Sequence, residues 1–120
     1  MKLLIADDDR TFCFLLAAEM RSRGWTVDIA SDAMQAVMFA MRGQPEAILL
    51  DIQMPGGTGV EALRKLKAST KTASIPVIGC SATADSATEG RIRELGATDF
   101  LRKPLDADAL DSTLRTLRGT

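Results

Sequence analysis

The sequence contains no histidine and no tyrosine. Without histidine, the chain lacks the commonest general base and the commonest zinc ligand, so chemistry built on an imidazole is excluded. Aromatic residues are few, with one tryptophan and four phenylalanines, and the 15 basic and 16 acidic residues nearly balance. This composition lacks the basic, aromatic-rich signature of a protein that binds nucleic acid directly.

Long apolar runs and cysteines are also scarce. The longest apolar runs are about five residues, whereas a membrane-spanning helix needs about 20. The N-terminal apolar run ends at Asp7, unlike a secretory signal peptide. Cys13 and Cys80 lie in apolar stretches, so we expect buried, reduced thiols and no disulfide. We therefore expect a cytoplasmic protein without membrane contact.

What the sequence does contain fits one folded unit. Its 120 residues are 46% hydrophobic and 26% charged, ordinary values for a globular domain long enough to bury a core. No composition shift, internal repeat or low-complexity tract divides the chain. We expect a single domain over residues 1–120.

Short apolar runs alternate with segments of helical periodicity. Strands are expected over residues 2–6, 25–30, 47–50, 76–80 and 99–102. Helical spacing of apolar residues recurs over 10–24, 33–41, 60–66, 84–95 and 110–117. The expected apolar stripe of the first helix is Phe12, Leu15, Leu16 and Met20, and that of the second is Ala33, Ala36, Val37, Ala40 and Met41. This alternation predicts an α/β fold of the (βα)5 type, with a parallel sheet covered by helices on both faces.

Three of the predicted helices carry residues whose surroundings can be predicted further. In the helix over 33–41, Met34, Met38 and Met41 with Phe39 widen the apolar arc, and we expect core packing, with an exposed partner surface as the alternative. The helix over 84–95 has a thin apolar stripe, which fits an element of low stability. The charged residues of the last helix are expected to be solvated, with pairing across the two-fold axis of a dimer as the alternative: Asp106, Asp108, Asp111, Arg115 and Arg118.

Polar residues follow four of the five expected strands. They are Asp7, Asp8 and Asp9 after the first, Asp51 after the third, Ser81 after the fourth and Lys103 after the fifth. In a parallel sheet with right-handed crossovers the carboxyl ends of all strands lie at one edge, where doubly wound folds bind ligands. We expect these side chains to converge there.

The chemistry of such a group is specific. Neighbouring carboxylates repel one another unless a cation joins them, and oxygen ligands without histidine or cysteine favour Mg²⁺. A lysine supplies positive charge for phosphoryl oxygens, and an aspartate itself acts as a nucleophile in phosphoryl transfer. The residues therefore predict Mg²⁺-assisted phosphoryl transfer to an aspartate, with Asp51 or Asp7 as the acceptor.

Four motifs carry a resemblance to a known family. They are LLIADDD at residues 3–9, LLDIQMPGGTG at 49–59, VIGCSA at 77–82 and ATDFLRKPL at 97–105. Together, in this order, they make the chain similar to receiver domains of bacterial two-component response regulators, and to the single-domain chemotaxis regulators among them. The resemblance implies a flavodoxin-like, doubly wound three-layer sandwich whose five-stranded parallel sheet has the order 2-1-3-4-5.

The resemblance also implies a role for each site residue. Asp51 matches the phosphoacceptor that becomes an aspartyl phosphate. Asp8 matches a direct ligand of Mg²⁺, or alternatively Mn²⁺, and Asp7 an acid that helps through water. Asp51 itself and the backbone carbonyl of Gln53 complete the implied metal site.

The remaining roles concern the response to phosphorylation. Lys103 matches the lysine that contacts the phosphoryl group, and Ser81 the switch hydroxyl drawn toward it. Phe100 matches the aromatic residue that turns inward on activation. Gln53 and Thr83 lie at positions that tune how long the phosphoryl group persists in relatives.

Two local features complete the resemblance. The Lys103–Pro104 bond is similar to one that is cis in the family. The loop before Gly59 departs from the family pattern: Thr58 stands where relatives often carry Asp or Asn, and Gly56–Gly57 makes the loop unusually flexible.

The implied function is a phosphorelay signalling switch, not an enzyme beyond self-phosphorylation and self-dephosphorylation. A sensor histidine kinase, a histidine phosphotransfer protein or a small donor would supply the phosphoryl group. The face formed by the fourth helix, fifth strand and fifth helix would then change its preference for an output partner that the sequence does not name. We expect a monomer or weak dimer.

Two alternatives remain open at this point. Asp7-x-Asp9-x-Thr11 after an apolar strand also fits the first motif of haloacid-dehalogenase-like phosphatases, with Asp7 as nucleophile and Asp9 as general acid. That reading leaves Asp51 unexplained, and the chain is short for that fold. A docking domain of the same architecture that is never phosphorylated is the second alternative.

Overall fold

The computed structural model describes residues 1–54, 59–83 and 85–117. Within these ranges five strands alternate with five helices, and the strands form one parallel sheet in the order β2-β1-β3-β4-β5. The bounds are β1 Lys2–Ala6, α1 Arg10–Ser22, β2 Thr26–Ala30, α2 Ala33–Gly43, β3 Ala47–Asp51, α3 Gly59–Ala68, β4 Val77–Ser81, α4 Ser86–Glu94, β5 Asp99–Arg102 and α5 Ala107–Leu117. The predicted α/β fold and strand order are confirmed.

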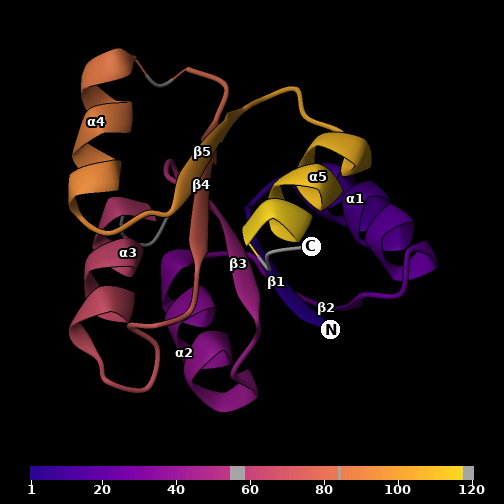
Figure 1. Cartoon of the computed structure of the whole chain (residues 1–120), viewed down its shortest axis with the longest axis horizontal. Helices are drawn as coiled ribbons and strands as arrows, with labels where there is room; N and C mark the ends of the chain where they lie inside the picture. Colours follow the sequence, from indigo (N-terminus) through magenta and orange to yellow (C-terminus); the bar gives the residue numbers. More distant parts are fainter. Residues whose placement is uncertain (55–58, 84, 118–120) are drawn as a thin grey trace.

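The molecule has three layers, with α1 and α5 on one face of the sheet and α2, α3 and α4 on the other (Figure 1). Successive residues of a strand point to opposite faces. In β1, Leu3 and Ile5 pack with the α1–α5 layer, while Leu4 and Ala6 pack with the other layer. The central strands β3 and β4 are buried at every residue, as expected for parallel strands covered on both faces.

Helix α1 buries a stripe that differs in part from the predicted one. Asp9 caps the helix, because its carboxylate accepts a hydrogen bond from the backbone N–H of Phe12 at 3.0 Å. Leu16 and Met20 are buried as predicted, but Leu15, expected on the same stripe, is 60% exposed. The buried face is completed instead by small residues, Cys13 and Ala17.

The methionines of α2 contradict the prediction of core packing. Met34, Met38 and Met41 are 71%, 40% and 37% exposed, although Phe39 packs partly buried against the core. The helix faces the sheet through three buried alanines instead: Ala33, Ala36 and Ala40. Because the alanines occupy the buried face, the longer methionines lie at and beyond its margin.

Helix α4 is the least anchored of the helices, as its thin stripe predicts. Ile92 is the single buried residue among its nine, and Asp85 caps it by accepting from the backbone N–H of Thr88 at 2.8 Å. A methyl group added at Gly90 would meet no atom within 4 Å. The helix thus depends on one apolar anchor and its cap.

Helix α5 is tied to α1 by charged side chains, which corrects the prediction that its charges are all solvated. Arg23 lies 2.6 Å from Asp108 and 3.5 Å from Asp111, and Asp111 is only 8% exposed. The hydrogen bond from Arg115 is the main cause that holds the pKa of Asp111 below its usual value.

Arg118 falls outside the described residues, as do Gly56, Gly57 and Thr58, for which an unusual loop was predicted.

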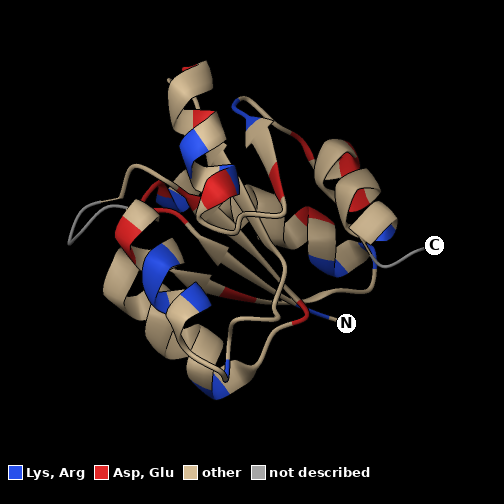
Figure 2. Ribbon diagram, turned by 60° about the vertical axis from the view of Figure 1, so that its left-hand side comes forward, with Lys and Arg blue, Asp and Glu red and all other residues tan. Residues whose placement is uncertain are grey.

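The surface carries acidic and basic residues interspersed over the helices of both layers (Figure 2). This distribution agrees with the near balance of 15 basic and 16 acidic residues in the sequence. Among the helices in the described part of the chain, none has the length and apolar character needed to cross a membrane.

Candidate functional site

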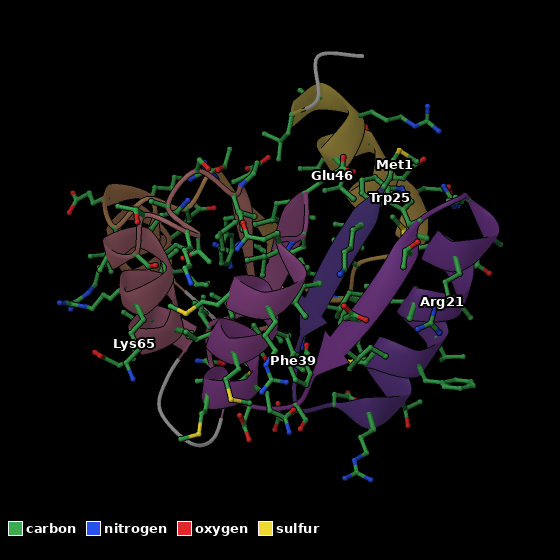
Figure 3. All side chains as sticks on the ribbon, turned by 90° about the horizontal axis from the view of Figure 1, so that it is seen from below. Met1, Arg21, Trp25, Phe39, Glu46 and Lys65 are labelled. Carbon is green, nitrogen blue, oxygen red and sulfur yellow. The ribbon has the colours of Figure 1, made fainter. Side chains whose placement is uncertain are left out.

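The polar residues predicted to converge do so at the carboxyl edge of the sheet. Asp7 directly follows β1, Asp51 and Ser81 end β3 and β4, and Lys103 directly follows β5. The strand register places Asp51 opposite Cys80, the residue before Ser81. The opposite edge of the sheet holds Met1, Trp25 and Glu46 (Figure 3), so the single tryptophan lies away from this site.

Three carboxylates are clustered at the site. One oxygen from each of Asp7, Asp8 and Asp51 lies within 4.8 Å of the other two. Asp7 and Asp51 are 2% and 6% exposed, whereas Asp8 is exposed to solvent. Three oxygen donors, of which one opens to water, suit a hard divalent cation such as Mg²⁺ that keeps several of its waters.

The two buried carboxylates are held in the same way. The backbone N–H of Asp9 donates to Asp7 Oδ1, and that of Gln53 donates to Asp51 Oδ1, both at 3.0 Å. These two-residue turns fix one oxygen of each carboxylate. The other oxygens face Lys103, whose Nζ lies 2.5 Å from Asp7 Oδ2 and 3.5 Å from Asp51 Oδ2.

This lysine balances the charge of the buried acids. Burial alone lowers the pKa of Lys103, but the hydrogen bond to Asp7 and the negative charges of Asp51 and Asp7 outweigh it and raise the pKa. For Asp7, burial raises the pKa, because it disfavours the charged carboxylate. The hydrogen bonds from Lys103 and from the Asp9 N–H lower it, but burial has the larger effect. The site thus holds a charged ammonium among carboxylates that lie close enough to repel one another.

The predicted switch and tuning residues share one hydrogen-bond network. Both the Ser81 and Thr83 hydroxyls donate to Gln53 Oε1, at 3.2 and 2.7 Å, and the Thr83 N–H donates to Ser81 Oγ at 3.1 Å. Sequence reasoning assigned Gln53 a backbone carbonyl and a tuning role, but not this side-chain link. The presence of a polar residue two positions after Asp51 was the only signal in the sequence for this link.

The aromatic residues near the site occupy different surroundings. Phe100 is buried at 6% exposure, and the Arg102 guanidinium carbon lies 5.6 Å from its ring centroid. Its inward turn on activation stays a prediction. Phe12, which sequence reasoning placed only on an apolar stripe, lies with its ring centroid 4.6 Å from Lys103 Nζ. The only signal for this contact in the sequence is that Phe12 follows the acids Asp7, Asp8 and Asp9 by about one helical turn.

The cysteines border the site as buried thiols. Both are free, which confirms the sequence prediction, and Cys13 Sγ donates to the backbone oxygen of Asp7 at 3.4 Å. Burial raises the pKa of Cys13 to about 12, and it raises that of Cys80 as well. Both side chains therefore stay protonated and unreactive at neutral pH.

The Lys103–Pro104 bond is cis, as the resemblance implied.

Residues 3–115 match the family model of the response regulator receiver domain. The chain belongs to this family. Receiver domains are phosphoacceptor signalling switches, not classical enzymes, and they interact with histidine kinases and output domains. This match confirms the predicted family and function, and it gives no support to the phosphatase or the unphosphorylated docking domain. Asp9, the general acid of the phosphatase alternative, instead caps α1 through one carboxylate oxygen.

Curated relatives cover the chain almost completely. It is 36% identical to the response regulator PleD of Caulobacter vibrioides over 97% of its own length, but spans only 26% of PleD. It is 32% identical to Protein PilH of Pseudomonas aeruginosa, with 97% of this chain and 96% of PilH aligned. Similar receiver sequences thus occur both in a longer regulator and in a protein of about this length.

Solved structures show the same architecture. The receiver domain of the sensor histidine kinase PA1611 from Pseudomonas aeruginosa is 28% identical, with a TM-score of 0.89 over 99% of this chain and 98% of that one. That structure has a magnesium ion coordinated in its active site cleft. A response regulator from Chloroflexus aurantiacus is 26% identical with a TM-score of 0.90, over 99% and 98% of the two chains.

Proposed function

We propose that this receiver domain accepts a phosphoryl group on Asp51 from a histidine kinase, a histidine phosphotransfer protein or a small donor. The observation that carries the proposal is the position of this carboxylate. It ends the central strand β3, is 6% exposed, and lies beside both the Lys103 ammonium and the carboxylates of Asp7 and Asp8.

Asp51 is better placed than Asp7 to be the acceptor. Both oxygens of Asp7 are engaged at 3.0 Å or less, one by the Asp9 N–H and one by Lys103. The Oδ2 of Asp51 is 3.5 Å from Lys103, a longer and weaker contact that leaves this oxygen more available. The backbone N–H of Gln53 holds the other oxygen, which orients the carboxylate.

A divalent cation fits the donor set of this site. In this proposal Asp7, Asp8, Asp51 and the backbone carbonyl of Gln53 hold Mg²⁺, and Mn²⁺ shares the same preference for oxygen donors. When bound, the metal neutralises charge that develops on the phosphoryl oxygens. The finding that the PA1611 receiver coordinates magnesium in its cleft supports this assignment.

The residues of the chain perform the rest of the reaction. Asp51 Oδ2 attacks phosphorus while the bond from phosphorus to the donor atom breaks, and the donor leaves with the electron pair. Lys103 contributes a fixed positive charge to the phosphoryl oxygens. Self-dephosphorylation is the attack of water on the same phosphorus, which restores the carboxylate.

The proposed output follows from Ser81. Once Asp51 carries a phosphoryl group, the Ser81 hydroxyl leaves Gln53 and donates to a phosphoryl oxygen, while Phe100 fills the space behind it. The α4–β5–α5 face then changes its partner preference, which the weak anchoring of α4 favours. The partner's identity, a cytoplasmic location and a monomeric or weakly dimeric state remain predictions from the sequence.

Intact-mass spectrometry tests the proposed function directly. The wild-type protein incubated with acetyl phosphate and Mg²⁺ is expected to gain one phosphoryl adduct, because the site supplies both the acceptor and the charges that it needs. Chelating the divalent cation with EDTA should reduce the adduct to the level of unincubated protein. No adduct in a folded sample with Mg²⁺ present would contradict the proposal.

Gln53 offers a test of the switch. Gln53→Met keeps the length of the side chain but removes the acceptor that holds Ser81 and Thr83. Since one hydrogen bond contributes about 1 kcal/mol net, release of Ser81 should raise the affinity for trifluoroberyllate, a phosphoryl analogue, about fivefold. Isothermal titration calorimetry with Mg²⁺ measures this affinity. Thr83→Val, which leaves the Ser81–Gln53 bond in place, is the matched control, and equal affinities for all three proteins would reject the link.

A further inference from the structure

The Lys103 ammonium has a third neighbour besides the two carboxylates. Its Nζ lies 4.6 Å from the centroid of the Phe12 ring, within the distance of about 6 Å at which a cation is attracted to an aromatic face. The lysine side chain is 18% exposed. The ring, Asp7 and Asp51 therefore surround a largely desolvated ammonium, where such a contact has its greatest strength.

The position of Phe12 is itself determined by the start of α1. Its backbone N–H donates to the capping carboxylate of Asp9 at 3.0 Å, and its side chain packs against the core beneath α1 and α5. The ring is thus attached to a capped helix terminus and not to a loop. A contact made from such an element is well defined in space.

Phe12 differs from the carboxylates in one decisive respect. Asp7 and Asp51 are also proposed to hold the metal, and Asp51 to become esterified, so their attraction for Lys103 changes during the reaction. The ring carries no charge and has neither role. The ring therefore attracts Nζ without itself changing when the carboxylates bind a metal or are esterified.

The ring also has neighbours outside the site. Phe12 lines a hollow between α1 and the start of α5, together with Glu19 and Leu105. The side chain therefore contacts the Lys103 ammonium and also forms part of the surface between these two helices.

We infer that Phe12 is a positioning residue for the phosphoryl transfer: its ring holds the Lys103 ammonium beside Asp51 by a cation–π contact. The inference rests on the proposed function of Asp51. It assigns a part in the reaction to a residue whose apolar character indicates only core packing.

A matched set of variants separates the ring's electrostatic role from its packing. Phe12→Leu keeps an apolar side chain but removes the aromatic face, and it should slow phosphorylation by acetyl phosphate about fivefold at saturating Mg²⁺, the factor that a cation–π contact of about 1 kcal/mol supplies. Phe12→Tyr keeps the face and should restore the wild-type rate. Phe14→Leu, on the same helix but 69% exposed, should leave the rate unchanged.

A double-mutant comparison links the effect to the lysine. In a Lys103→Met background, where no cation remains, Phe12→Leu should not weaken trifluoroberyllate binding further, whereas it should do so when Lys103 is present. Thermal unfolding confirms that each variant is folded. If Phe12→Leu does not fold, Phe12→Met, another apolar side chain without a ring, replaces it.

The outcomes distinguish this inference from the proposed function. No adduct on the wild-type protein would overturn the role of Asp51 and the inference with it. An adduct on the wild type that forms equally fast in Phe12→Leu would overturn the inference alone. The same holds if Phe12→Tyr is as slow as Phe12→Leu, because packing and not the aromatic face would then set the rate.

Discussion

Asp51→Asn is expected to abolish the phosphoryl adduct that acetyl phosphate and Mg²⁺ produce on the wild-type protein. The neutral amide oxygen is a far weaker nucleophile than the carboxylate, so the rate should fall by about a thousandfold or more. The amide is close to isosteric and its oxygen can still accept from the Gln53 N–H, a bond of 3.0 Å to the carboxylate in the wild type. The fold should therefore persist, and intact-mass spectrometry on the folded variant measures the loss.

Asp7→Asn is the matched comparison for this experiment. It leaves the proposed acceptor in place and removes one of the three clustered carboxylates. We expect an adduct that forms more slowly and needs more Mg²⁺, because the donor set is weakened. An adduct that persists in Asp51→Asn and disappears in Asp7→Asn would instead make Asp7 the nucleophile and favour the phosphatase-like chemistry.

Gly59→Ala is expected to cause a large loss of stability. Gly59 begins α3 against the end of β3, and a Cβ at this position would lie 2.1 Å from the backbone oxygen of Asp51 and 2.4 Å from Cα of Ile52. These are backbone atoms, so no side-chain rotation relieves the overlap. We expect the free energy of unfolding to fall by about 3 kcal/mol, at the upper end of the usual cost of overpacking.

Urea unfolding measures the stability of this variant, and the same protein should also phosphorylate more slowly because the backbone of Asp51 must move. Gly90→Ala is the matched control, since it adds the same methyl group to α4 where no atom lies within 4 Å. There alanine's better helix propensity should raise the free energy of unfolding by about 0.5–1 kcal/mol. A Gly59→Ala midpoint equal to that of the wild type would show that the close approach has no such cost.

The order of strands and helices follows from local patterns in the sequence. Buried parallel strands appear as short apolar runs, and the helices between them show their own periodicity, so the predicted ranges agree with the structure to within a few residues. The convergence of the strand-end residues Asp7, Asp51, Ser81 and Lys103 was equally predictable. In a parallel sheet, topology alone brings the carboxyl ends of the strands to one edge.

The sequence-based predictions that were wrong concern how much of a helix surface is buried. Leu15 and Met34 have the apolar character of core residues, yet they are 60% and 71% exposed. Periodicity shows which face of a helix is apolar, but the width of the buried stripe depends on which side chains meet the sheet. In α2 three alanines at the predicted helical spacing make that contact. The error was to expect the buried stripe to be wide enough to include the methionines as well.

The sequence by itself therefore determined the fold class, the family and the group of acids, lysine and hydroxyl at the sheet edge, because each depends on local periodicity or on topology. Tertiary structure decided which partners those groups choose: the Phe12 ring over Lys103, the amide of Gln53 between two hydroxyls, and Arg23 beside Asp111. Phe12 and Lys103 lie far apart along the chain, and they meet because α1 begins just after β1 and Lys103 follows β5 at the same carboxyl edge of the sheet. Contacts of this kind depend on distances of a few ångströms between packed elements, which no sequence pattern encodes.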